Sequence, residues 1–284
     1  MMRILIIIAA IFFQFTASVL AVSNNTKNIE RINLNLKDHE MAVTFFGLSD
    51  GEVTLIQGPN GKNILVNVGG KDTLCDLKEL LSLYKVQQIQ TIIITNSDNL
   101  TFDSINKIIS TYNVKNIIAT PHISTQLNSR LPTGNKIEIV TWEAGAESEL
   151  FPDLLIEVLF SGDGQNEGLD FTLNFFKHRL FFMNSSSHRA EEIFLNNINL
   201  NTINIYKIPN WAKEDSLSER LIQYLNPQIS ILFESENHQP DPEIINDLQD
   251  TWSEILFTKK HGTISLKFTE ANYEVFTFRK EKSN

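Results

Sequence analysis

The stretch Thr91-Ile-Ile-Ile-Thr-Asn-Ser-Asp-Asn-Leu-Thr-Phe-Asp-Ser104 decides the fold. Its β-branched run, residues 91–94, predicts a fully buried strand, and the polar cluster behind it predicts the loop that opens a helix. In α/β folds, ligands and catalytic groups gather at that end of a strand. The loop offers hydroxyls, amides and the carboxylate of Asp98, but neither His nor Cys. We therefore expect a site here whose side chains are mostly neutral.

Three short β-rich runs precede this strand, at residues 41–46, 53–57 and 63–68. Turn-forming stretches at 47–51 and 58–61 separate them, which predicts an antiparallel meander. Leucines then recur at helical spacing over 74–83 and predict an amphipathic helix.

The rest of the chain alternates helices and strands. Periodicity predicts helices over 102–112, 188–195, 217–225 and 242–248, and strands over 114–119, 154–160, 171–176, 179–182, 203–207, 229–233, 255–257, 262–268 and 273–278. Such alternation requires sheets with helical layers against them. Two sheet-plus-helix halves of similar size indicate a single domain over 41–280 of the α/β (α+β) class.

Several stretches carry a resemblance to a known family. Thr95-Asn-Ser-Asp-Asn-Leu-Thr101 and Val66-Asn-Val-Gly-Gly70 follow two predicted strands. They resemble the metallo-β-lactamase fold superfamily, in the ComEC-type branch of hydrolase-like domains, which has Thr-His-x-His-x-Asp-His and Ile-Asp-x-Gly-Gly at these places. The turn glycines Gly51, Gly69 and Gly70 are kept, whereas Asn67 replaces a carboxylate.

Later landmarks show the same pattern. Met183-Asn-Ser-Ser186 stands where the family has the Gly-Asp that bridges metals, and Lys207-Ile-Pro-Asn-Trp-Ala-Lys213 stands where it has Pro-His-His-Gly-Ser. Asn237-His-Gln-Pro240 and Thr258-Lys-Lys-His-Gly-Thr-Ile264 resemble its late motifs. Glycines, prolines and strands match, and each metal position differs.

The resemblance implies a four-layer αββα sandwich and a hydrolase with two divalent metals such as zinc or manganese. A metal-activated hydroxide needs about three or four strong ligands, and amide and hydroxyl oxygens are weak ones for these ions. We therefore predict a degenerate site without catalytic residues or metal cofactors. Its vestigial pocket would be formed by Asn67, Asn96, Asp98, Thr101, Asn184, Ser185, Asn210 and Trp211.

Three functions remain open on this basis. The first is a noncatalytic binding or scaffold protein with an unknown ligand or protein partner. The alternative is an active metal-dependent hydrolase, phosphodiesterase-like or nuclease-like, with relocated ligands such as His122, His188 and Asp98. The third is an interaction module whose pocket is filled by side chains such as Trp211.

Other polar motifs have simpler interpretations. Ser185-Ser-Ser187 precedes a helix and predicts N-caps. Asp50-Gly-Glu52 is interpreted as an acidic turn, and His122 as a hydrogen-bonded turn residue. The only cysteine, Cys75, lies on the helix over 74–83 and cannot form an intramolecular disulfide.

The acidic composition bears on which partners the protein can bind. A formal net charge of -10 and a pI near 5.1 argue against broad nucleic-acid binding, which needs a positive surface.

The N-terminus predicts export. Met1-Met-Arg3, an apolar run and Ala21-Val-Ser23 form the pattern of a signal peptide over 1–23. The competing interpretation is an uncleaved membrane anchor over 4–22. Residues 24–40 are polar, and we expect a linker that ends in an edge strand. The protein is accordingly expected to be secreted or extracytoplasmic, touching a membrane only through its N-terminal segment.

Overall fold

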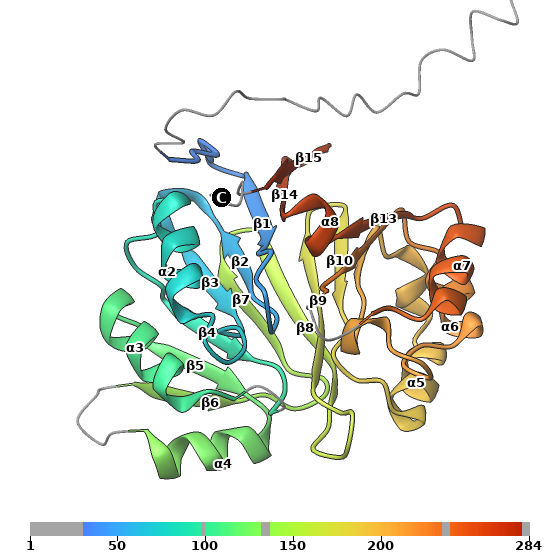
Figure 1. Ribbon diagram of the computed structural model, residues 1–284, viewed down its shortest axis with the longest axis horizontal. Coiled ribbons are helices and arrows are strands. Elements are labelled where there is room, and N and C mark those ends of the chain that lie inside the picture. The colour runs from blue at the N-terminus through green and yellow to red at the C-terminus, as the bar shows by residue number, and fades with distance from the viewer. Residues whose placement is uncertain (1–30, 98–99, 132–136, 235–238, 280–284) are drawn as a thin grey trace, which may run out of the picture.

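The computed structural model describes residues 31–97, 100–131, 137–234 and 239–279. Two large sheets pack face to face, and helices cover the outer face of each, so the chain forms the four-layer αββα sandwich that was expected (Figure 1). No helix in these ranges is both long and apolar enough to span a membrane. The predicted signal segment and the first part of the linker lie outside the described residues.

The first sheet has eight strands in the order β15-β14-β1-β2-β3-β4-β5-β6. Their bounds are β1 Met41–Phe45, β2 Thr54–Gln57, β3 Asn63–Val66, β4 Thr91–Ile94, β5 Asn116–Ala119, β6 Glu138–Thr141, β14 Thr263–Phe268 and β15 Tyr273–Phe278. Strands β1, β2 and β3 form the predicted antiparallel meander, and β3 to β6 run parallel.

The second sheet has seven strands in the order β13-β12-β11-β10-β9-β8-β7. Their bounds are β7 Glu147–Phe151, β8 Leu154–Ser161, β9 Leu169–Phe175, β10 His178–Phe182, β11 Ile205–Lys207, β12 Ile229–Leu232 and β13 Glu254–Phe257. Strands β8, β9 and β10 are antiparallel, while β10 to β13 are parallel.

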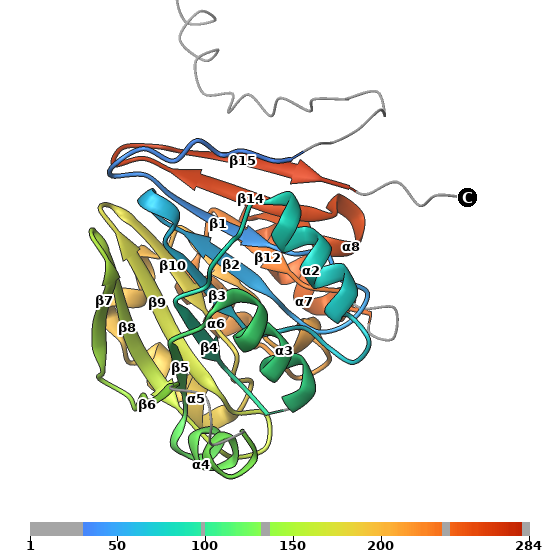
Figure 2. The same cartoon turned by 90° about the vertical axis from the view of Figure 1, so that its left-hand side faces the viewer.

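Helices form the outer layers. They are α2 Leu74–Leu83, α3 Phe102–Tyr112 and α4 Pro121–Arg130 beside the first sheet, α5 His188–Leu195, α6 Glu219–Leu225 and α7 Pro242–Asp250 beside the second, and the short α8 Thr258–His261. Figure 2 shows α2 and α3 lying across the outer face of the first sheet. Short 3₁₀ turns occur at Pro59–Gly61, Ile198–Thr202 and Asn210–Ala212.

Strand alternation divides the core into three apolar clusters. In β4, Ile93 points between the two sheets, whereas Ile92 and Ile94 point toward the helices. A third cluster lies under α5, α6 and α7. Since successive side chains of a strand face opposite sides, a strand such as β4, which is buried along its whole length, fits a sheet that is covered on both faces.

The observed elements match the predicted ones within two residues at each end, but α4, β6, β7 and the short α8 were not predicted. His122, interpreted as a turn residue, lies instead in the first turn of α4, where its Nε2 is 2.7 Å from Nε2 of Gln126. Cys75 is on α2 as expected and is exposed.

The described end of the expected linker, residues 31–40, forms no strand. It lies against the domain: the backbone N–H of Ile32 donates to the carbonyl of Leu83 at 2.8 Å, and Ile32 and Leu34 pack on the cluster under α2. Lys267 pairs with Glu40 at 3.0 Å.

The two halves meet closely where β4 ends and β9 begins. The N–H of Leu169 donates to the carbonyl of Thr95 at 2.7 Å, and a Cβ added at Gly168 would lie 2.4 Å from that carbonyl oxygen. Only glycine permits this approach of two backbones. The contact brings the loops of both sheets to one edge of the sandwich.

Replacing Gly168 by Ala is expected to lower the free energy of unfolding by about 1–3 kcal/mol, because the new methyl group meets backbone that cannot move aside alone. Urea unfolding measures the change. Gln165→Ala, in the exposed part of the same loop, is the control and should stay within about 0.5 kcal/mol of the parent. An unchanged Gly168→Ala midpoint would contradict the close approach.

Candidate functional site

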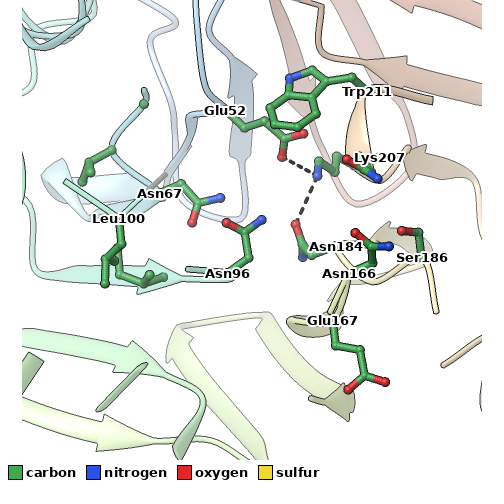
Figure 3. A pocket seen from close by; sticks show the side chains of 14 residues that line it. Glu52, Asn67, Asn96, Leu100, Asn166, Glu167, Asn184, Ser186, Lys207 and Trp211 are labelled. Carbon is green, nitrogen blue, oxygen red and sulfur yellow. Dashed lines mark hydrogen bonds and ion pairs between the residues drawn. The ribbon is translucent and has the colours of Figure 1, made fainter. Parts of the chain in front are cut away.

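A polar pocket opens at this edge of the sandwich. Its lining comes from the loops after β1, β3, β4, β8, β10 and β11, and consists of Glu52, Asn67, Val68, Gly69, Ile94, Asn96, Leu100, Asn166, Glu167, Asn184, Ser186, Lys207, Asn210 and Trp211 (Figure 3). The structure thus brings together segments that are far apart in the sequence.

The eight residues expected from the sequence are placed as follows. Asn67, Asn96, Asn184, Asn210 and Trp211 line the pocket. Thr101 is the N-cap position of α3, and Ser185 lies buried behind the lining. Asp98 lies outside the described residues.

An ion pair between Glu52 and Lys207 was missed by the sequence analysis. Lys207 ends β11, is 3 % exposed, and its Nζ contacts Oε2 of Glu52, whose side chain is 10 % exposed. The ammonium also donates to Oδ1 of Asn184 at 3.1 Å and to the carbonyl of Met183 at 3.3 Å. The alternation of side chains along a strand could have indicated that Lys207 is buried, because Lys207 lies two residues after Ile205 and shares the inward face of β11 with it.

Asn67 ties β3 to β4. The N–H of Thr95 donates to its Oδ1 at 2.9 Å, and its Nδ2 donates to Oγ1 of Thr95 at 2.9 Å. Its φ of 60° lies in the left-handed region, which asparagine tolerates better than most residues. The amide therefore has a structural role. A carboxylate at this position could not donate the hydrogen bond that Oγ1 of Thr95 accepts.

Asn184 is also engaged by the fold on both ends of its amide. Its Nδ2 donates to the carbonyl of Leu169 at 2.7 Å, while its Oδ1 accepts from Lys207. By contrast, Asn96 and Asn210 make no side-chain hydrogen bond among the residues described, so their amides can turn to the pocket or to water.

A buried carboxyl group, Asp170, holds the loop after β10. Its Oδ1 accepts from the N–H groups of Asn184 at 2.5 Å and Ser185 at 2.9 Å, and the hydroxyl of Ser185 donates to its Oδ2. Complete burial raises the pKa of Asp170 to about 7, although the hydrogen bonds and Lys207 act in the opposite direction. Asp170 is not among the site residues expected from the sequence, because it lies one residue before the predicted strand over 171–176.

Glu167 lines the pocket, and several groups donate hydrogen bonds to its carboxylate. Arg189 donates to both of its oxygens, Nε at 3.0 Å and Nη2 at 2.5 Å, and Ser187 and the N–H of Gly164 add further bonds. The hydrogen bond from Arg189 is the main cause that lowers the pKa of Glu167. Ser187 also caps α5 as predicted, accepting from the N–H of Ala190.

The segment after β11 has a strained backbone. Asn210, Trp211 and Ala212 have φ values of 48°, 55° and 52°, a conformation that costs energy in a non-glycine residue. Hydrogen bonds hold it, including one of 2.7 Å from the N–H of Asp241 to the carbonyl of Ala212. In this conformation Trp211 packs against the central core and lines the pocket. Lys213 Nζ lies 4.6 Å from the centroid of its ring.

The free space is small. The pocket has a cavity volume of about 30 Å³, room for roughly one water molecule. A neighbouring polar cavity of about 370 Å³ shares Asn166 and Glu167 with it and extends to Thr120, His122 and Asp163. Any larger ligand would fit the second cavity rather than the first.

The residues described do not fit a pair of catalytic metals. No three His, Cys, Asp or Glu side chains among them converge as metal ligands. The pocket offers amides and two carboxylates, and each carboxylate is already paired with a cation, Glu52 with Lys207 and Glu167 with Arg189. Neutral amides compensate little of a divalent ion's charge. Of the relocated ligands considered above, His188 is exposed and 3.3 Å from Glu192, and His122 lies in the second cavity.

Comparison with known proteins identifies the fold. No family model matches the sequence, and no curated protein matches it either. Among solved structures, the metallo-β-lactamase fold protein YhfI from Bacillus subtilis is 14% identical with a TM-score of 0.57, and the match covers 82% of this chain and 100% of that one. A diphosphatase from the PhnP family is 12% identical with a TM-score of 0.55, covering 80% and 97%. The chain therefore has the metallo-β-lactamase fold.

Asp170 should make stability depend on pH. Because its folded pKa, about 7, exceeds the unfolded value near 3.8, the folded state binds the extra proton between these values, and stability falls as pH rises through the window. Asp170→Asn keeps the acceptor oxygen and removes the titration. We expect the unfolding free energy of the variant minus that of the parent to increase as pH rises, by up to about 1.4 kcal/mol per pH unit.

Urea unfolding at several pH values between about 4 and 8 measures this difference. Asp163→Asn, an exposed carboxylate of the neighbouring loop, is the control and should give a constant difference. A pH-independent gap between Asp170→Asn and the parent would show that Asp170 is already ionised at the acid end of the window.

Proposed function

We propose that this chain is an exported, noncatalytic binding or scaffold protein on a metallo-β-lactamase fold, with a degenerate metal site of the ComEC-type branch. The observation that carries the proposal is the chemistry of the pocket. Where the resemblance implies histidines and carboxylates, the described lining presents Asn67, Asn96, Asn184 and Asn210, and the carboxylate of Glu52 is neutralised by Lys207. Such a lining does not hold and activate a metal-bound water.

The size of the pocket supports the scaffold part of the proposal. Trp211 and the ion pair line the pocket, and its volume of about 30 Å³ suits a water molecule. Two of the four amides serve the fold rather than a ligand, since Asn67 bonds to Thr95 and Asn184 to Lys207. A small polar ligand would use the adjacent cavity of about 370 Å³, and a protein partner would use the outer surface.

Metal analysis combined with a hydrolysis assay tests the proposal. Purified protein is dialysed against buffer with Mn²⁺ or Zn²⁺, its metal content is measured by mass spectrometry, and hydrolysis of bis(p-nitrophenyl) phosphate is followed. We expect no stoichiometric metal and no turnover above buffer with the same ions.

About one or two tightly held ions per chain, together with turnover, would overturn the proposal in favour of a metal-dependent hydrolase. Asn184→Ala is the matched control for any hydrolysis that is seen. Turnover that this pocket variant abolishes belongs to the pocket. Turnover that it leaves unchanged is followed through size-exclusion chromatography: activity that elutes with the chain overturns the proposal, and activity that separates from it comes from a contaminating hydrolase.

A further inference from the structure

We infer that the Lys207 ammonium occupies an internal cation site between the two sheets and supplies there the positive charge that metal ions supply in proteins of this fold. The inference rests on the proposed function in one respect, that the pocket holds no metal pair. It concerns what takes the metals' place, and it is tested by stability rather than by metal content or turnover.

The contacts of the ammonium are those of a complete site. An ammonium has three N–H donors, and Lys207 Nζ has three oxygen partners: the Glu52 carboxylate, the Asn184 amide and the Met183 carbonyl. The ring of Phe233 adds a face whose centroid is 5.9 Å from Nζ. The 3 % exposed ammonium thus makes two hydrogen bonds and one ion pair, all of them to oxygen.

The oxygens come from both halves of the molecule. Glu52 follows β1 of the first sheet, whereas Met183 and Asn184 follow β10 of the second. Figure 3 shows the ammonium between the Glu52 carboxylate and the Asn184 amide, with interactions drawn to both. The lysine therefore joins the loops of the two sheets, as a bridging cation would.

Charge balance makes the lysine necessary. The Glu52 side chain is 10 % exposed, and an ionised carboxylate buried without a partner costs several kcal/mol, so removal of one partner of such a pair is strongly destabilising. The site is also closed to a second cation, because the ammonium holds the oxygens that a hard ion would need and repels its charge.

A double-variant cycle tests the compensation. Thermal unfolding is measured for Lys207→Met, Glu52→Gln and the combined variant, with the exposed Lys177→Met as the matched control. We expect Lys207→Met to lower Tm by about 10 °C, Glu52→Gln to lower it by a similar amount, and the combined variant to lie within about 5 °C of the parent. Lys177→Met should not change Tm.

The cycle remains informative if a single variant fails to fold, since a folded combined variant then shows the same compensation. A combined variant less stable than either single variant, or a Lys207→Met variant as stable as the parent, overturns the inference.

A rescue experiment tests the cation site itself. Lys207→Ala leaves the three oxygens and removes the side chain that reached them, so millimolar n-butylammonium should raise its Tm by at least about 3 °C above NaCl of equal ionic strength. The parent and Glu52→Gln/Lys207→Ala should not respond to this cation. Equal shifts in all three proteins, or no shift in Lys207→Ala, would show that no cation site lies beneath the lysine.

Discussion

The contact between the Glu52 carboxylate and the Lys207 ammonium is the interaction on which this edge of the molecule depends. Elsewhere the sheets are held by apolar side chains such as Phe45, Phe171 and Phe182, which stack between them. At the loops that packing ends, and polar groups must satisfy each other where water has little access. A charge of each sign, one from each sheet, meets that requirement directly.

The neighbouring polar groups are likewise paired with each other, through hydrogen bonds. Asp170 gathers the two N–H groups of the loop after β10, and this loop then offers Asn184 Oδ1 and the Met183 carbonyl to Lys207. On the first sheet, Asn67 fixes the end of β4 through Thr95, whose carbonyl receives the N–H of Leu169. The polar residues of the pocket therefore form two connected networks of structural bonds, and only a few amides remain available for a ligand.

Much of the fold was readable from the sequence because its signals are local. The run Thr91–Ile94 is β-branched throughout and carries isoleucines on both faces, and the glycines between β1, β2 and β3 mark turns. The unpredicted α4 buries two apolar residues, Ile123 and Leu127, and β6 buries none fully, so neither shows a strong period. Whether these elements form depends on tertiary packing, which a local sequence pattern does not reveal.

The site was only partly readable for the same reason. The positions after the strands could be expected to converge, since parallel strands bring their carboxyl ends to one edge. Glu52 was interpreted as part of an acidic turn because nothing near it in the chain reveals a partner on β11. Asp170 likewise looks like an ordinary polar residue just before a strand until the loop after β10 closes over it. Pairings across sheets are fixed by the assembled fold.

The Lys207 side chain has one more consequence, which concerns how the molecule is made. A bound metal has to be acquired after synthesis, from a supply that differs between compartments and growth conditions, whereas a lysine is delivered by the ribosome at a fixed place in the chain. The positive charge at this edge is therefore part of the polypeptide, and it reaches Glu52 when the sheet that holds β10 and β11 packs against the sheet that holds β1.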